Sequence, residues 1–236
     1  MCYFCAINKR NNSQNLTNMN KVMKAIAALM LTTAVLFTAE CMNAQTHNGH
    51  DYVDLGLPSG TLWATCNVGA TTPEGYGDYF AWGETQPKDY YDNESIYKYA
   101  NGSKLTKYTG SDGLTSLEPS DDAATTNWGS DWRTPTKAQW DELLANTTNQ
   151  WTTKNGVKGR QFTSKKNGRK LFLPAAGERW LDYLGNAGSF GFYWSSSLYT
   201  AVPGNAWYFE FHSDFCSVYY NGRRSRGWPV RAVREH

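Results

Sequence analysis

The chain of 236 residues is poor in the residues on which many enzyme sites depend. It has four histidines, and three of them, His47, His50 and the terminal His236, lie near the ends of the predicted exported domain. The sequence has no G-x-S-x-G nucleophile motif and none of the glycine-rich motifs that bind nucleotide phosphates. We therefore expect neither a hydrolase triad nor a nucleotide site, and we predict that the protein is not an enzyme.

Cysteine is scarce as well. Of five cysteines, only Cys66 and Cys216 lie beyond residue 44. Two cysteines do not form a disulfide framework, so we expect two separate thiols. His212 and Cys216 have a spacing that could offer two zinc ligands, but a tetrahedral zinc site needs three or four, and no partner pair is present. We predict no metal site from this pair.

Acidic residues occur in two adjacent pairs, Asp121-Asp122 and Asp141-Glu142. A glycosidase uses two carboxylates, but across a cleft. The first pair, with Glu118, could also offer oxygen ligands to calcium, although EF-hand spacing is absent. Adjacent carboxylates more often cap a helix or a loop. We expect that role and no cofactor, with calcium as the alternative.

The one long apolar run lies near the N-terminus. It covers residues 25–39, follows Lys21 and Lys24, and leads through small and polar residues to Ala44. A membrane span needs about 20 apolar residues, so the run favours a cleaved signal peptide over a retained anchor. The leader region is therefore residues 1–44, with a start at Met19 and cleavage after Ala44. We expect export to the cell surface, the periplasm or the medium.

Cys41 offers another mode of attachment, because exported lipoproteins carry their lipid on a cysteine. A small residue normally precedes that cysteine, whereas Glu40 does here, so we do not expect lipidation. Removing residues 1–44 leaves 19 Lys and Arg against 20 Asp and Glu, a net charge of −1. This balance gives no reason to expect a nucleic-acid partner, and we expect no transmembrane segment after leader removal.

Residues 45–236 suit a single domain with a substantial core. The clearest helix begins at Thr136, which forms a capping box with Gln139. Trp140, Leu143 and Leu144 then lie on one apolar face.

Strand signals surround this helix. Residues 52–68 indicate strands around the turn at 58–60, whereas 71–108 predicts ordered loop. Residues 159–165 and 169–173 flank Asn167-Gly168 and predict a hairpin. Short β segments follow Pro174. We predict an α+β fold with small antiparallel sheets, few helices and much ordered loop.

The C-terminal segment, residues 198–226, has the composition of a binding surface, rich in Tyr, Trp, Asn, Ser, Gly and Arg. Within it Trp207, Phe209 and Phe211 alternate with Tyr208, Glu210 and His212, which predicts one core face and one solvent face. Residues 216–220 continue the alternation, Asn221-Gly222 predicts a turn, and 230–233 a last strand. We expect the ligand to contact Tyr199, Tyr208, His212, Asp214, Ser217, Tyr219, Tyr220, Asn221, Arg223 and Arg224.

Several motifs follow one another along the domain: DLGLPSGTLWATCNVGA at 54–70, YGDYFAWGE at 76–84, DAAT at 122–125, WRTPT at 132–136, FLPAAG at 172–177, YWSSS at 193–197 and VRAVR at 230–234. In this order they resemble the Fibrobacter succinogenes major paralogous domain family, which is common in exported proteins of Bacteroidetes. The resemblance spans essentially the whole of residues 45–236.

The resemblance implies a C-type-lectin-like fold, which formylglycine-generating enzymes share. Those enzymes need two closely placed cysteines late in the chain, whereas only Cys216 is present, so their activity is not carried over. The same fold hosts the variable proteins of diversity-generating retroelements, in which adenine mutagenesis changes a C-terminal segment. GFYWSSS at 191–197 and GWPVRAVR at 227–234 look like the flanks of such a segment. A member that is not diversified would share these flanks, and both interpretations stay open.

Three functions are therefore compared. The first is an exported or surface-bound binding protein, such as an adhesin, with a protein or glycan ligand. The second is a carbohydrate-active or formylglycine-type enzyme, suggested by the fold and the acidic pairs alone. The third is a structural or pilus-tip adhesin subunit. The Tyr-rich C-terminal segment favours the first.

Overall fold

The computed structural model describes residues 21–25, 45–92, 96–218 and 221–235. The chain divides into two compact units, Met1–Ala44 and Gln45–His236. In the first unit, residues 21–25 are helical. The boundary between the units coincides with the cleavage site expected from the sequence, and cleavage itself stays a prediction. No helix within the described residues combines the length and the apolar character that crossing a membrane requires.

The second unit begins and ends in one antiparallel sheet with the strand order β1-β2-β3-β15. Its strands are β1 (Gln45–His47), β2 (His50–Asp54), β3 (Leu62–Ala64) and β15 (Val233–Arg234). Val53 pairs with Trp63, and Trp63 pairs with Val233 on its other side. The predicted turn at 58–60 is confirmed, because the Gly60 amide donates to the Leu57 carbonyl.

Helix α3 (Lys137–Asn146) confirms the clearest prediction from the sequence. The Thr136 hydroxyl accepts from the Gln139 amide, the Gln139 side chain accepts from the Thr136 amide, and Trp140 and Leu143 are buried. The sheet β6-β7-β8 follows directly. It consists of β6 (Thr147–Lys154), β7 (Val157–Ser164) and β8 (Lys170–Pro174), so the hairpin at 167–168 is confirmed. The pattern did not predict β6, which is almost entirely polar.

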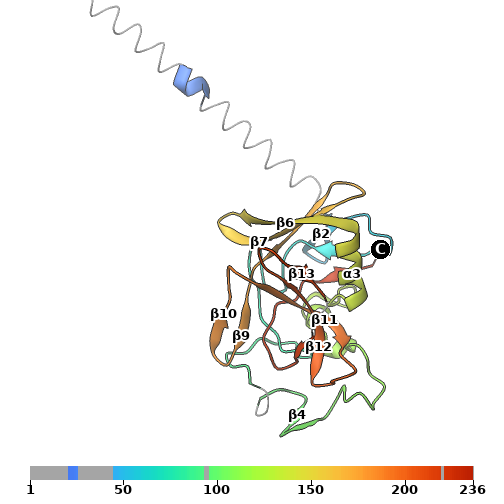
Figure 1. Ribbon diagram of the computed structural model, residues 1–236. Coiled ribbons are helices and arrows are strands. Elements are labelled where there is room, and N and C mark those ends of the chain that lie inside the picture. Colours follow the sequence, from blue (N-terminus) through green and yellow to red (C-terminus); the bar gives the residue numbers. More distant parts are fainter. Residues whose placement is uncertain (1–20, 26–44, 93–95, 219–220, 236) are drawn as a thin grey trace, which may run out of the picture. The chain divides into compact units, whose positions relative to one another are not determined.

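Between β3 and α3 the chain is mainly ordered loop. It contains the short strands β4 (Ala100–Asn101) and β5 (Lys104–Leu105), the 3₁₀ turn η1 (Pro119–Asp121) and helix α2 (Ala123–Trp128). A small hairpin after β8 is formed by β9 (Glu178–Trp180) and β10 (Tyr183–Gly185). It stands at the left-hand edge of the domain in Figure 1.

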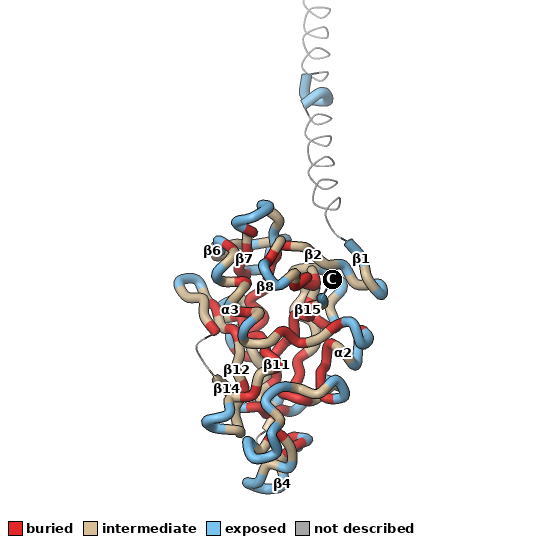
Figure 2. Tube along the Cα trace, turned by 90° about the vertical axis from the view of Figure 1, so that its right-hand side faces the viewer, coloured by how far each residue is buried: buried red, intermediate tan, exposed pale blue. Residues whose placement is uncertain are grey.

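The remaining strands form the sheet that carries the C-terminal segment. They are β11 (Gly191–Leu198), β12 (Asn205–Phe211), β13 (Cys216–Ser217) and β14 (Asn221–Arg223). The buried residues form two clusters, one containing Trp82 and Trp194, the other Trp140 and Phe209. Strands β11 and β12 supply residues to both, and Figure 2 shows buried segments gathered around them with exposed turns at the rim. The α+β prediction is confirmed at the level of small antiparallel sheets, few helices and much ordered loop.

Candidate binding surface and its buried anchor

Strand β12 is the centre of the candidate site. It pairs with β11 along one edge and with both β13 and β14 along the other. Asn221–Arg223 therefore forms the strand β14, and the predicted turn at Asn221-Gly222 is wrong. A Cβ on Gly222 would lie 2.2 Å from the Trp228 ring, so glycine lets this strand pass over the indole.

The two faces of β12 differ from the expected core and solvent faces. Phe209 and Phe211 are fully buried as predicted, and Phe209 stacks on Trp140 with ring centroids 4.5 Å apart. The opposite face is only partly open to solvent. There Tyr208 is half-buried against Trp228, at 4.3 Å between centroids, and donates its hydroxyl hydrogen to Glu210 Oε2 at 2.9 Å. Tyr208 thus packs against the core, and only part of it can meet a ligand.

Trp207 was expected in the core but is only half-buried. The register between β11 and β12 shifts here, because the pair Trp194–Tyr208 is followed by Leu198–Ala206. Trp207 consequently packs edge-on to Tyr199, at 5.0 Å between centroids, and lies under the ammonium of Lys137. This small aromatic pair is partly accessible at the surface.

The other candidate residues differ in exposure. Asp214 and Arg223 are exposed, whereas Tyr199, His212, Ser217 and Asn221 are half-buried, like Tyr208. His212 stacks on Phe215, and its Nδ1 accepts from the Asp214 amide at 3.3 Å. Asn221 Oδ1 accepts from Asn205 Nδ2 at 2.7 Å. Tyr219 and Tyr220 lie outside the described residues.

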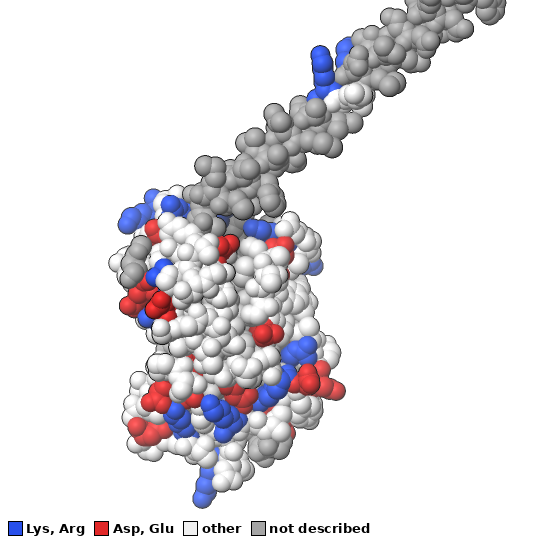
Figure 3. Space-filling model, turned by 180° about the vertical axis from the view of Figure 1, so that it is seen from behind, with Lys and Arg blue, Asp and Glu red and all other residues white. Residues whose placement is uncertain are grey.

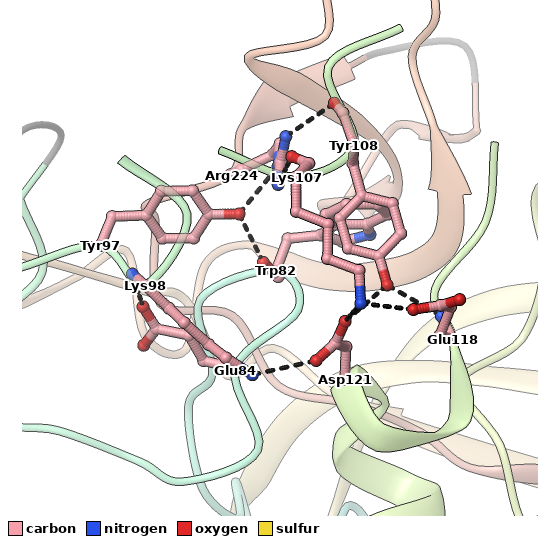
Figure 4. A network of polar contacts seen from close by, with 9 residues as sticks. All are labelled: Trp82, Glu84, Tyr97, Lys98, Lys107, Tyr108, Glu118, Asp121 and Arg224. Carbon is pink, nitrogen blue, oxygen red and sulfur yellow. Dashed lines mark hydrogen bonds and ion pairs between the residues drawn. The ribbon is translucent and has the colours of Figure 1, made fainter. Parts of the chain in front are cut away.

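Arg224 was predicted to contact the ligand, and the structure contradicts this. Its exposed fraction is 1 %, because the chain turns inward after Arg223. Nε donates to the Tyr97 hydroxyl at 2.7 Å, and the two terminal nitrogens donate to the carbonyls of Lys107, Tyr108 and Pro203 at 3.0–3.2 Å. Figure 4 shows the guanidinium beside Tyr97, Lys107 and Tyr108.

Aromatic rings complete the surroundings of Arg224. Its guanidinium carbon lies 4.8 Å from the centre of the Trp82 ring and 5.3 Å from that of Tyr97. Cation–π attraction and carbonyl dipoles therefore take the place of a carboxylate partner. Burial raises the pKa of Tyr97, although the guanidinium opposes that change, so its phenol stays neutral. The result is a rigid anchor between the C-terminal segment and the loop that precedes α2.

A second part of this network surrounds Asp121. Lys98 and Lys107 contact its two oxygens at 2.9 and 2.6 Å, and Tyr108 donates to it at 2.7 Å. Burial alone would raise the pKa of Asp121, but the bonds from Lys107 and Lys98 outweigh burial and hold it well below its usual range. Figure 4 shows Lys107 bridging Asp121 and Glu118. These oxygens already have partners.

Asp122 caps helix α2, which confirms the capping role expected for this pair. Its carboxylate accepts from the amides of Ala124 and Thr125 and from both the amide and the hydroxyl of Thr134. In the second acidic pair, Asp141 contacts Lys137 at 2.7 Å, and Glu142 accepts from the Ser59 amide and hydroxyl. Both pairs thus serve local structure.

Cys66 and Cys216 are separate thiols, as expected, and burial raises the pKa of Cys216 to about 12. Within the described part of the chain, no three His, Cys, Asp or Glu side chains are arranged to hold a metal ion. Figure 3 shows acidic and basic side chains interspersed on the face that it presents.

The sequence interpretation missed one group beside the C-terminal segment. The Arg226 guanidinium lies 3.9 Å from the centre of the Trp180 ring on β9 and contacts Glu178 at 3.2 Å. Glu178 also accepts from the Trp228 indole at 3.3 Å. The exposed Tyr183 pairs with Trp180 across the hairpin. The aromatic residues around 180–183 were the available signal for this group, but nothing in the sequence indicated that Arg226 would contact them.

Comparison of the chain with known protein families, with curated proteins and with solved structures gave no match.

Proposed function

We propose that the protein is an exported binding protein with a C-type-lectin-like fold, of the family that its motifs resemble. Its recognition surface consists of the outward side chains of the C-terminal segment: Tyr199, His212, Asp214, Ser217, Asn221 and Arg223. The ligand is a protein or a glycan. Tyr219 and Tyr220 stay in the proposal from the sequence alone.

One observation carries this proposal: side chains next to each other in sequence are exposed in one case and buried in the other. Arg223 is exposed, whereas Arg224 is buried in the anchor, and Gly222 lies against the Trp228 ring. The backbone that carries Arg223 is therefore fixed on both sides, by Gly222 against the indole and by the buried Arg224. Rigid presentation of polar and aromatic side chains lowers the entropy lost on binding.

The enzyme alternative was suggested by fold analogy and by the acidic pairs. Asp121 and Asp122 are occupied by lysines, a tyrosine and backbone amides, so their geometry gives no reason to assign them a proton-transfer role. Binding therefore remains the proposal with support from the geometry.

The test is a binding screen on an array of defined glycans and on purified extracellular-matrix proteins. For any probe that binds, the triple variant Asp214→Ala, Asn221→Ala, Arg223→Ala should lower the affinity at least tenfold. It should leave the melting temperature within about 6 °C, since three surface changes at up to about 0.5 kcal/mol each cost up to about 1.5 kcal/mol. Unchanged affinity would disprove this surface as the site. Val202→Ala, at an exposed position, is the control.

Diversification is tested in the DNA. If the segment is a retroelement target, a near-copy of codons 198–234 that differs mainly at adenines should lie beside a reverse-transcriptase gene. A genome without such a copy removes diversification and leaves the binding proposal unchanged.

A further inference from the structure

Two exposed tyrosines lie outside the C-terminal segment. Tyr183 on β10 is 68 % exposed, and Tyr90 in the loop before β4 is 43 % exposed. Each follows an exposed aspartate, Asp182 and Asp89. Large exposed aromatic side chains are typical of surfaces that bind a partner.

The backbone brings the two Asp-Tyr pairs together. Tyr91 and Leu181 exchange two backbone hydrogen bonds, each of 2.8 Å, as an antiparallel bridge. The bridge is isolated, and Leu181 has a left-handed backbone, with φ of 56°, at the turn of the β9–β10 hairpin. Because Tyr90 precedes Tyr91 and Asp182 follows Leu181, the bridge brings the backbones of the two Asp-Tyr pairs to the same end of the β9–β10 hairpin.

The chemistry of these side chains is that of a cation site. Asp89 and Asp182 make no ion pair or hydrogen bond through their carboxylates with any other described residue. Aromatic rings attract cations over their faces, and carboxylates form charge-assisted hydrogen bonds with guanidinium and ammonium groups. The neighbouring Trp180 already holds the Arg226 guanidinium in this way, with Glu178 as the carboxylate. The hairpin thus already contains one contact in which an aromatic ring and a carboxylate together hold a guanidinium group.

We propose that Asp89, Tyr90, Asp182 and Tyr183, here named the tip surface, bind arginine or lysine side chains of a protein partner. The charge favours this partner, because two carboxylates without partners among the described residues would repel an anionic lipid surface and would give a neutral sugar no charge to match. This proposal goes beyond the recognition surface above and does not depend on it.

The experiment uses protein produced from the full chain and three labelled probes: octa-arginine, octa-glutamate and a neutral Gly-Ser octapeptide. Fluorescence anisotropy should show binding of octa-arginine only, weakening as salt is raised. Tyr183→Ala and the pair Asp89→Asn with Asp182→Asn should each lower that affinity about three- to tenfold, since exposed cation–π and ionic contacts are modest.

Asp131→Asn is the matched control, because it removes an exposed aspartate that lies outside both the tip surface and the C-terminal segment. It should leave octa-arginine binding unchanged. Equal binding of all three probes, no binding of octa-arginine, or the same loss in Asp131→Asn as in the tip variants would overturn the proposal. The variants in the C-terminal segment test the proposed function separately, so either idea can fail alone.

Discussion

Replacing Arg224 by methionine tests the anchor most directly. Methionine fills much of the same volume but provides none of the hydrogen bonds to Tyr97, Lys107, Tyr108 and Pro203. Leaving a buried acceptor without a donor costs about 1–3 kcal/mol. With partial relaxation around three carbonyls, we expect a loss of about 3–5 kcal/mol in the free energy of unfolding.

The loss can be measured by urea unfolding followed through tryptophan fluorescence, and by calorimetry. For a domain of this size 1 kcal/mol corresponds to about 2–4 °C, so the melting temperature should fall by about 6–20 °C. Arg224→Lys should lose less than methionine, because it keeps the cation but lacks the planar fork.

The neighbouring Arg223→Met is the matched control. Arg223 is exposed, so its replacement should change stability by no more than about 0.5 kcal/mol. If Arg224→Met costs less than about 1 kcal/mol, or no more than Arg223→Met, the buried guanidinium does not hold the segment and the reasoning is refuted.

Three further predictions follow from single contacts. Gly222→Ala should cost about 1–3 kcal/mol in urea unfolding, because its Cβ would overlap the Trp228 ring; a neutral result would mean that β14 shifts freely. Because the pKa of Asp121 is lowered in the folded state, its carboxylate stabilises the fold above its unfolded pKa of about 3.9, and this stabilisation is lost as the pH falls below that value. Asp121→Asn should therefore lose less stability than the unmodified protein between pH 5 and 2. An equal loss in both proteins would contradict the lowered pKa. Since burial raises the pKa of Cys216 to about 12, iodoacetamide at pH 8 should not modify it until the protein is unfolded, as peptide mass spectrometry would show.

Local signals in the sequence predicted local structure well. The capping box at Thr136 and the Asn167-Gly168 turn depend on residues within a few positions of each other, so the sequence contains the whole interaction. Strand β6 was missed because it has no apolar alternation of its own. Its extended structure is determined by its neighbours β7 and α3.

The candidate site was harder to predict, for a physical reason. Arg223 and Arg224 are identical in type, and contacts with distant residues decide which one is buried; Tyr97 and Tyr108 lie more than 100 positions away. Tyr208 was expected in solvent because β12 alternates, but a second core cluster covers that face too. A periodic pattern distinguishes two faces of a strand without showing what covers each one.

The sheet β1-β2-β3-β15 has a consequence for how the domain can be joined to other chains. Gln45 pairs with Tyr52, Tyr52 with Ala64, and the Ala64 amide bonds to the Ala232 carbonyl. With strands about 4.8 Å apart, the two ends of the domain lie within about 15 Å of each other. Such a domain can be inserted into a loop of another protein, or circularly permuted through a short linker, without displacing either end.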